Sequence, residues 1–227
     1  MIKTNNYYIR VQQRGCTIAT NEKEQNFVFR EPNKTLKFES QIRDFFSFEE
    51  ECRDQLKQLN YKVHPWSKNH LYFSIPNDLG SIQLRSYFDC ADHLDATDVF
   101  LLRENVAILL DEQFDDAKTY LMVGLFDSKI EFSIMKNYRF KFLKSYLADS
   151  ALLTDINHFN RLITTTIQDI KANHTIDEYW CIHERSTEAP SSIRNFKRLA
   201  NKNELIIAGL KKAERQQIDR LVGRLKL

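Results

Sequence analysis

Residues 71–76, LYFSIP, and residues 98–107, DVFLLRENVA, decide the fold of this chain. The first stretch belongs to a short apolar strand that we expect at residues 69–75, stopped by Pro76. The second is an apolar run typical of a buried strand, and it leads directly into a helix that begins at Glu104. Residues 79–94, between them, have the apolar spacing of a helix. Strands and helices that alternate in this way predict an α/β protein.

A meander precedes this segment. Residues 7–12, 16–20 and 26–30 are strand-like runs separated by turn residues, and residues 40–60 have a mostly helical spacing with Ser40 as the expected N-cap. The first half of the chain therefore has the order β-β-β-α-β-α, followed by one more strand and helix.

The second half of the chain repeats this order. We expect strands at 118–126, 130–135, 138–143, 178–182 and 205–208, and helices at 154–172, with Thr154 as N-cap, at 191–200 and at 210–225. Two similar units in tandem predict two halves, residues 1–116 and residues 117–227, with a basic amphipathic helix at the end of the second half.

Glycine is scarce in this chain, and the scarcity excludes two classes of nucleotide-binding site. The sequence has 5 glycines in 227 residues, against a usual share of about 7%. They stand far apart, so neither G-x-G-x-x-G nor G-x-x-x-x-G-K-[ST] can be formed from them. The usual dinucleotide fingerprint and the P-loop are therefore excluded.

Charge and cysteine content point to an ordinary cytoplasmic protein. Lys+Arg of 33 against Asp+Glu of 31 leaves a formal charge of +2, which is too balanced for a surface dedicated to nucleic acid. The 4 cysteines are scattered and form no C-x-x-C pair. The N-terminus has no apolar signal segment, and no apolar stretch is long enough to span a bilayer. We expect cytoplasmic localisation and no nucleic-acid partner.

Three stretches of the chain resemble the superfamily of actin-like proteins, sugar kinases and Hsp70, and most closely the bacterial actin homologues of the MreB and FtsA kind. They are 27–33, FVFREPN, where the family has a strand ending in Asn-Glu-Pro-Ser, together with 71–76 and 98–107. Asn105 stands where the family has proline. The resemblance implies a compact actin-like fold of two RNase H-like halves.

The same resemblance indicates where a nucleotide cleft would lie and how this chain departs from it. Arg14, Gly15, Gly124, Asp127 and His183 match the positions that line the cleft in the family, but the first hairpin has no acidic residue and the second has lost most of its glycines. Bulky side chains at these positions obstruct the backbone contacts that hold phosphate. We expect no cofactor and a degenerate ATPase.

Two catalytic alternatives stay open. Glu104 matches the family's glutamate that activates the attacking water, so one alternative is a divergent ATPase that binds ATP and magnesium. The other is a metal-dependent nuclease of the RNase H type. It would use the carboxylates of Asp115, Asp116, Asp127 and Glu131, although the first strand supplies none. The sequence shows no histidine spacing typical of a metal site, and we expect no metal.

Two segments are candidates for binding a partner. Phe45, Phe46 and Phe48 are so close together that a helix cannot turn all three inward, and at least one of them should be exposed. The last helix carries Arg215, Arg220 and Arg224 opposite an apolar side, so residues 211–227 could pack in the core, bind a partner protein or lie on an anionic membrane surface.

The sequence therefore predicts a non-catalytic actin-like scaffold or assembly protein of the cytoskeletal, division or pilus and secretion-platform type. We expect it to act through contacts with other proteins or with itself, in the cytoplasm or at the periphery of the inner membrane.

Overall fold

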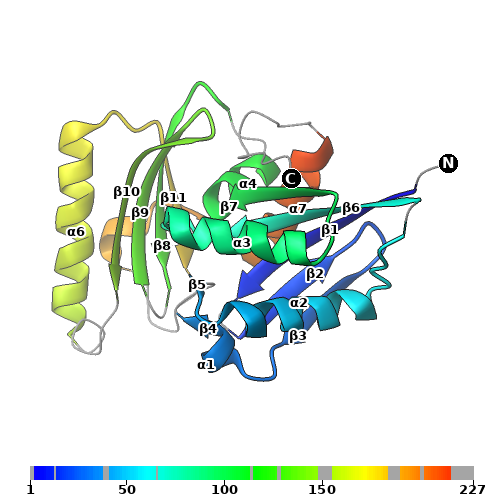
Figure 1. Cartoon of the computed structure of the whole chain (residues 1–227). Helices are drawn as coiled ribbons and strands as arrows, with labels where there is room; N and C mark the ends of the chain where they lie inside the picture. Colours follow the sequence, from blue (N-terminus) through cyan, green and yellow to red (C-terminus); the bar gives the residue numbers. More distant parts are fainter. Residues whose placement is uncertain are drawn as a thin grey trace. The chain divides into compact units, whose positions relative to one another are not determined.

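The computed structural model describes residues 3–12, 14–37, 41–64, 66–112, 115–126, 129–147, 155–183, 190–199 and 202–215. The chain divides into two compact units, each built on a five-stranded mixed sheet (Figure 1). Unit 1 comprises Met1–Gln113 and the C-terminal helix from Asn203 on, and unit 2 comprises Phe114–Lys202. These two sheets with their helices confirm the predicted α/β class.

The sheet of unit 1 has the strand order β3-β2-β1-β6-β7. An antiparallel meander forms one side of it, and two parallel strands extend the other. The strands are β1 (Lys3–Gln12), β2 (Gly15–Ala19), β3 (Glu24–Val28), β6 (Ser67–Ile75) and β7 (Asp98–Arg103). All five were expected from the sequence, with boundaries shifted by a few residues.

Helices α2 (Phe45–Gln58) and α3 (Ser81–His93) contribute to the main core of unit 1. Phe48 of α2 and Tyr87 of α3 are fully buried, and their rings pack at a centroid distance of 5.6 Å. Helix α2 begins after Asp44, whose side chain accepts a hydrogen bond from the Ser47 amide, so Asp44 is the N-cap. The predicted cap, Ser40, lies outside the described residues.

The remaining elements of unit 1 are two longer helices and a short connection. They are α4 (Glu104–Asp111), α7 (Lys202–Arg215), and the linking elements α1 (Pro32–Thr35), β4 (Leu36–Lys37) and β5 (Gln41–Ile42). Gly209 of α7 lies so close to α4 that an added Cβ would stand 1.9 Å from the Ala107 carbonyl oxygen. We predicted that the last helix belongs to the second half of the chain. The close packing against α4 instead places α7 in unit 1.

The sheet of unit 2 has the same plan, with the order β10-β9-β8-β11-β12. Its strands are β8 (Thr119–Leu125), β9 (Lys129–Lys136), β10 (Arg139–Leu147), β11 (Glu178–His183) and β12 (Lys197–Leu199). Helix α6 (Ile156–Asn173) packs Phe159, Ile163, Ile167 and Ile170 into the core of this unit. Asp155 caps α6, and the predicted cap, Thr154, lies outside the described residues.

Two predicted elements near the C-terminus are wrong. Residues 191–200 do not form a helix but a short 3-10 turn, η1 (Ser191–Ile193), followed by β12, which pairs in parallel with β11. Residues 205–208 are not a strand but part of α7. The adjacent β-branched residues Ile206 and Ile207 resemble a strand locally, but with Leu210 and Ala213 they are buried at helical spacing.

Across the described ranges, no helix is both long and apolar enough to cross a membrane.

Candidate functional site

The alternation of side chains along β1 creates a polar face in unit 1. Ile9 and Val11 point into the main core, so Tyr8, Arg10 and Gln12 project from the opposite face of the sheet. An arginine at this central strand position is costly unless it is paired, because burial removes its hydration.

Arg10 is paired with Glu104, the glutamate that the sequence singled out. The Arg10 Nε lies 3.4 Å from Glu104 Oε1, and each side chain is only 10% exposed. The guanidinium also donates a hydrogen bond, at 3.1 Å, to Oδ1 of Asn203, which lies in the first turn of α7. Three elements, β1, α4 and α7, therefore converge on one buried charge pair.

Side-chain hydrogen bonds extend this pair across the meander. Gln12 Nε2 donates to Asn203 Oδ1 at 3.0 Å and to Thr17 Oγ1 at 2.9 Å, and the Thr17 hydroxyl donates to Asn26 Oδ1 at 2.5 Å. We call Arg10, Gln12, Thr17, Asn26, Glu104 and Asn203 the polar network. Its amides and hydroxyl bond to one another across strands β1, β2 and β3, which gives a satisfied structural network.

The first hairpin uses its glycine for packing. A Cβ on Gly15 would stand 1.8 Å from the Phe27 carbonyl oxygen of the adjacent strand, so only glycine permits this approach of β2 to β3. The neighbouring Arg14 side chain is exposed, and its carbonyl accepts a hydrogen bond from the Phe29 amide at 2.9 Å. Close backbone packing therefore accounts for Gly15 without a phosphate.

In unit 2, Gly124 faces a side chain, whereas Gly15 faces backbone. A Cβ on Gly124 would meet the Phe126 ring at 2.5 Å. His183 is the last residue of β11 and pairs with Leu125 of β8, so it lies one register step from Gly124. Unit 2 thus brings together two of the predicted cleft residues, Gly124 and His183; the third, Asp127, lies outside the described residues.

The second hairpin carries a buried ion pair. Lys129 Nζ lies 3.1 Å from Glu131 Oε2 on β9, with side chains 7% and 3% exposed. Glu131, which the nuclease alternative would use as a metal ligand, is thus held by a lysine. No group of three or more His, Cys, Asp or Glu side chains that could hold a metal ion occurs in the described part of the chain.

The start of α2 confirms the expectation for its three phenylalanines. Phe48 is fully buried, Phe45 is partly buried, and Phe46 is 75% exposed. Phe46 packs edge-on against Phe45 at a centroid distance of 5.6 Å, and both line a shallow hollow with Lys34 and Arg43. We call this surface the α2 patch.

The predicted basic contacts of the last helix fall at the limit of what the structure describes. Arg215 is the final residue of α7, while Arg220 and Arg224 lie outside the described residues. Upstream of Arg215, α7 is bound to its own unit, because Lys212 Nζ lies 2.9 Å from Asp111 Oδ1 and Glu214 bonds to Asn6 and Tyr8.

Comparison with solved structures identifies the fold. The apo pSK41 ParM protein superposes with a TM-score of 0.60 at 8% identity, over 96% of this chain and 99% of that one. The ethanolamine utilization protein EutJ from Carboxydothermus hydrogenoformans gives a TM-score of 0.55 at 7% identity, over 92% and 89% of the two chains. The chain has the actin-like fold. No protein-family model and no curated protein matches its sequence.

The actin-like fold confirms the resemblance drawn from residues 27–33, 71–76 and 98–107. Sequence reasoning nevertheless missed the partner of Glu104. Arg10 stands between Ile9 and Val11 in an alternating strand, and this position could have marked it as a buried cation in need of a carboxylate. Asn203 gave no such signal, because it is 193 residues away from Arg10.

Proposed function

We propose that this actin-like protein is a non-catalytic assembly component that works by binding other proteins or further copies of itself. The observation that carries the proposal is the buried pair of Arg10 and Glu104. A glutamate that positions an attacking water must have its carboxylate within hydrogen-bond reach of that water. Here a guanidinium lies against the carboxylate, and Asn203 of α7 accepts a second hydrogen bond from that guanidinium.

The two hairpin glycines support the same proposal. Gly15 is explained by the close approach of β3, and Gly124 by the Phe126 ring. Neither glycine has the positive φ of a loop that turns its amides toward phosphate. The residues that match the family's cleft positions in unit 1 therefore serve packing and internal hydrogen bonding.

The α2 patch supports the assembly role. An exposed phenylalanine beside a partly buried one, with Lys34 and Arg43 at the rim, has the composition of a protein-binding surface: an aromatic centre with cationic edges. We propose that Phe46 is its anchor. Binding at a membrane surface through residues 211–227 is a second mode of contact that the assembly role would accommodate.

Thermal melting with and without Mg-ATP tests the non-catalytic part. A ligand at 100 times its dissociation constant stabilises a protein by about 2.7 kcal/mol. We expect no shift in melting temperature and no phosphate release. A clear shift, together with hydrolysis that Glu104→Gln abolishes, would favour the divergent ATPase instead.

Sedimentation velocity over a range of concentrations tests the assembly part. We expect association, with this protein or with an added partner, to be weakened in Phe46→Ser. The matched control is Leu147→Ser, which removes a side chain 68% exposed on unit 2. If the two variants associate equally strongly, the α2 patch is not the surface through which the protein assembles.

A further inference from the structure

Strand β1 is longer than the neighbour on one of its sides. It spans 10 residues, whereas β2 spans 5 and pairs only with Tyr8–Gln12. On its other side β1 pairs with β6 from Lys3 to Arg10. Residues 3 to 7 therefore have a strand on one side only, and no other described strand pairs with them.

The free side of this segment presents main-chain hydrogen-bonding groups. The Lys3 amide donates to the Trp66 carbonyl on the β6 side at 3.0 Å. Alternate residues of a strand direct their N–H and C=O groups to opposite sides. Thr4 and Asn6 therefore direct theirs away from β6, and no hydrogen bond to these main-chain groups occurs among the described residues.

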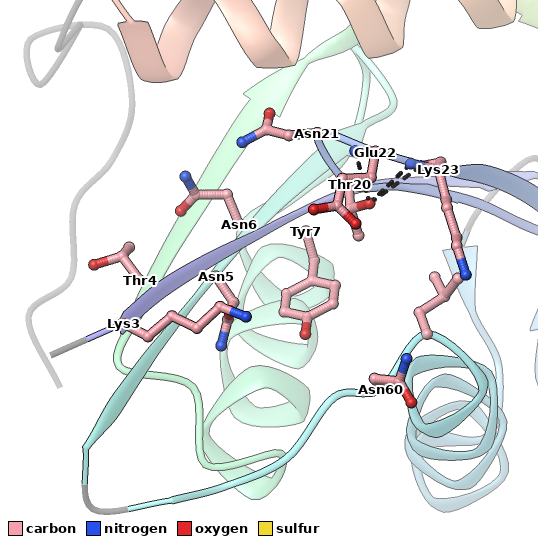
Figure 2. A pocket seen from close by; sticks show the side chains of 11 residues that line it. Lys3, Thr4, Asn5, Asn6, Tyr7, Thr20, Asn21, Glu22, Lys23 and Asn60 are labelled. Carbon is pink, nitrogen blue, oxygen red and sulfur yellow. Dashed lines mark hydrogen bonds between the residues drawn. The ribbon is translucent and has the colours of Figure 1, made fainter.

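A pocket of about 260 Å³ lies along this free edge (Figure 2). The β2–β3 turn closes one side of it, and the end of α2 lies below it. Its lining residues are Lys3, Thr4, Asn5, Asn6, Tyr7, Thr20, Asn21, Glu22, Lys23, Leu59 and Asn60. All belong to unit 1, so one rigid sheet and its turn form the whole site.

The side of the pocket toward α2 combines an apolar floor with positive charge. Tyr7 and Leu59 are 4% and 9% exposed and provide apolar surface. Figure 2 shows Lys3 and Lys23 toward opposite ends of the pocket, with Tyr7 between them, while Glu22 is the pocket's one acidic lining residue. An apolar side chain flanked by acidic ones would complement this arrangement.

We propose that this edge is a strand-addition site, at which an extended acidic peptide of a partner protein pairs with residues 3 to 7 of β1. The peptide continues the sheet in line with β2, bonds to the main chain of Thr4 and Asn6, and places alternate side chains over Tyr7 and toward the two lysines. This mode takes affinity from the main chain and specificity from alternate side chains. It names a partner class for the assembly role and rests on the proposed function.

The polar composition of the edge makes the site selective. Exposed strand edges tend to pair indiscriminately, and lysine on an edge opposes such pairing. Lys3, Thr4, Asn5 and Asn6 give this edge no apolar surface of its own, so a strand gains from pairing only if it also fills the pocket and offsets the positive charge.

Fluorescence anisotropy with a labelled seven-residue peptide, Thr-Glu-Thr-Val-Thr-Glu-Thr, tests the proposal on the full-length protein. We expect saturable binding. Replacing both glutamates of the peptide by lysine should weaken binding at least tenfold. Two further peptides carry N-methyl groups, one on the odd-numbered amides and the other on the even-numbered amides. Only one of these two sets faces β1, so one peptide should bind at least tenfold more weakly and the other should bind as the unmodified peptide does.

Variants of the edge complete the test. Thr4→Pro removes the main-chain N–H of residue 4, which faces the pocket, and leaves the hydrogen bonds between β1 and β6 intact. It should therefore reduce peptide binding at least tenfold. Thr4→Val, which keeps this N–H, should bind the peptide as the wild type does. Lys23→Glu should weaken binding of the acidic peptide, and Lys23→Gln should weaken it to a smaller extent. If Thr4→Pro does not fold, the two methylated peptides still test whether the peptide pairs with the main chain of β1.

Three results would overturn the inference. The first is an absence of saturable binding by the acidic peptide. The second is binding that neither Thr4→Pro nor either methylated peptide alters. The third is self-association that Thr4→Pro abolishes without peptide binding, which would assign the edge to a second copy. None of these measurements uses nucleotide or Phe46, so they fail independently of the tests of the proposed function.

Discussion

Replacing Gly209 by alanine should destabilise unit 1, although alanine is the better helix former. The new Cβ would lie 1.9 Å from the Ala107 carbonyl oxygen and 2.5 Å from its carbon, which are backbone atoms of α4. Restoring ordinary contact requires α4 and α7 to separate by about 1.5 Å, which weakens the packing of Ile206, Leu210 and Ala213.

The magnitude follows from two opposing effects. Overpacking costs about 1–3 kcal/mol and more where backbone must move, while the higher helix propensity of alanine returns about 1 kcal/mol. Because the obstacle is backbone and not a flexible side chain, we expect an overpacking cost at the upper end of that range, about 3 kcal/mol, and therefore a net loss of about 2 kcal/mol. In a chain of this size each kcal/mol lowers the melting temperature by about 2–4 °C.

Differential scanning calorimetry of Gly209→Ala measures the effect. The control is Gly80→Ser, because nothing lies within 4 Å of a Cβ at Gly80 and serine is favoured at this N-cap of α3. The control should melt at the wild-type temperature or slightly above it. An unchanged or raised melting temperature for Gly209→Ala would refute the close packing of α7 on α4 and with it the assignment of α7 to unit 1.

Three further predictions concern charged and thiol groups. Arg10→Met removes the guanidinium from the buried Glu104 carboxylate and should cost about 3–5 kcal/mol in urea unfolding. The double variant with Glu104→Gln should recover much of that loss, and equal stability of both variants would contradict the pairing. Burial raises the pKa of the Cys16 thiol to about 12, so its labelling by iodoacetamide at pH 8 should proceed only through unfolding, and rapid labelling of the native protein would argue against that burial. Burial of the Glu49 carboxyl raises its pKa, but the hydrogen bonds and positive charges of Arg53 and His93 together outweigh burial, and the pKa lies below its ordinary value of 4.5. Glu49 therefore stabilises the fold above that value and loses this effect as pH falls through the folded-state pKa, so Glu49→Gln should flatten the acid limb of a stability-against-pH curve.

Local patterns predicted most of the strands and helices. Alternation identified β1, β2 and β3, and the long apolar run identified β7 and the start of α4, because side-chain periodicity within one element is a local property. Close spacing of three phenylalanines was enough to predict that one of them is exposed, because a helix turns consecutive residues in different directions.

The same local patterns failed at the end of the chain. Residues 197–199 were expected in a helix and form β12, because a strand this short becomes stable only when β11 supplies its hydrogen bonds. The β-branched pair at 206 and 207 was expected in a strand and lies in α7, because its burial against unit 1 outweighs its strand propensity.

The sequence by itself determined the succession of strands and helices, the absence of a P-loop or dinucleotide fingerprint, and the actin-like resemblance, because each rests on residues adjacent in the chain. Only the tertiary structure decided that Arg10 holds Glu104, that α7 packs against α4, and that residues 3 to 7 of β1 have a free edge. These features depend on contacts between residues far apart in the chain, such as Arg10 and Glu104, which are 94 positions apart. No local periodicity records such contacts, because burial, pairing and strand register are set only when the whole sheet has formed.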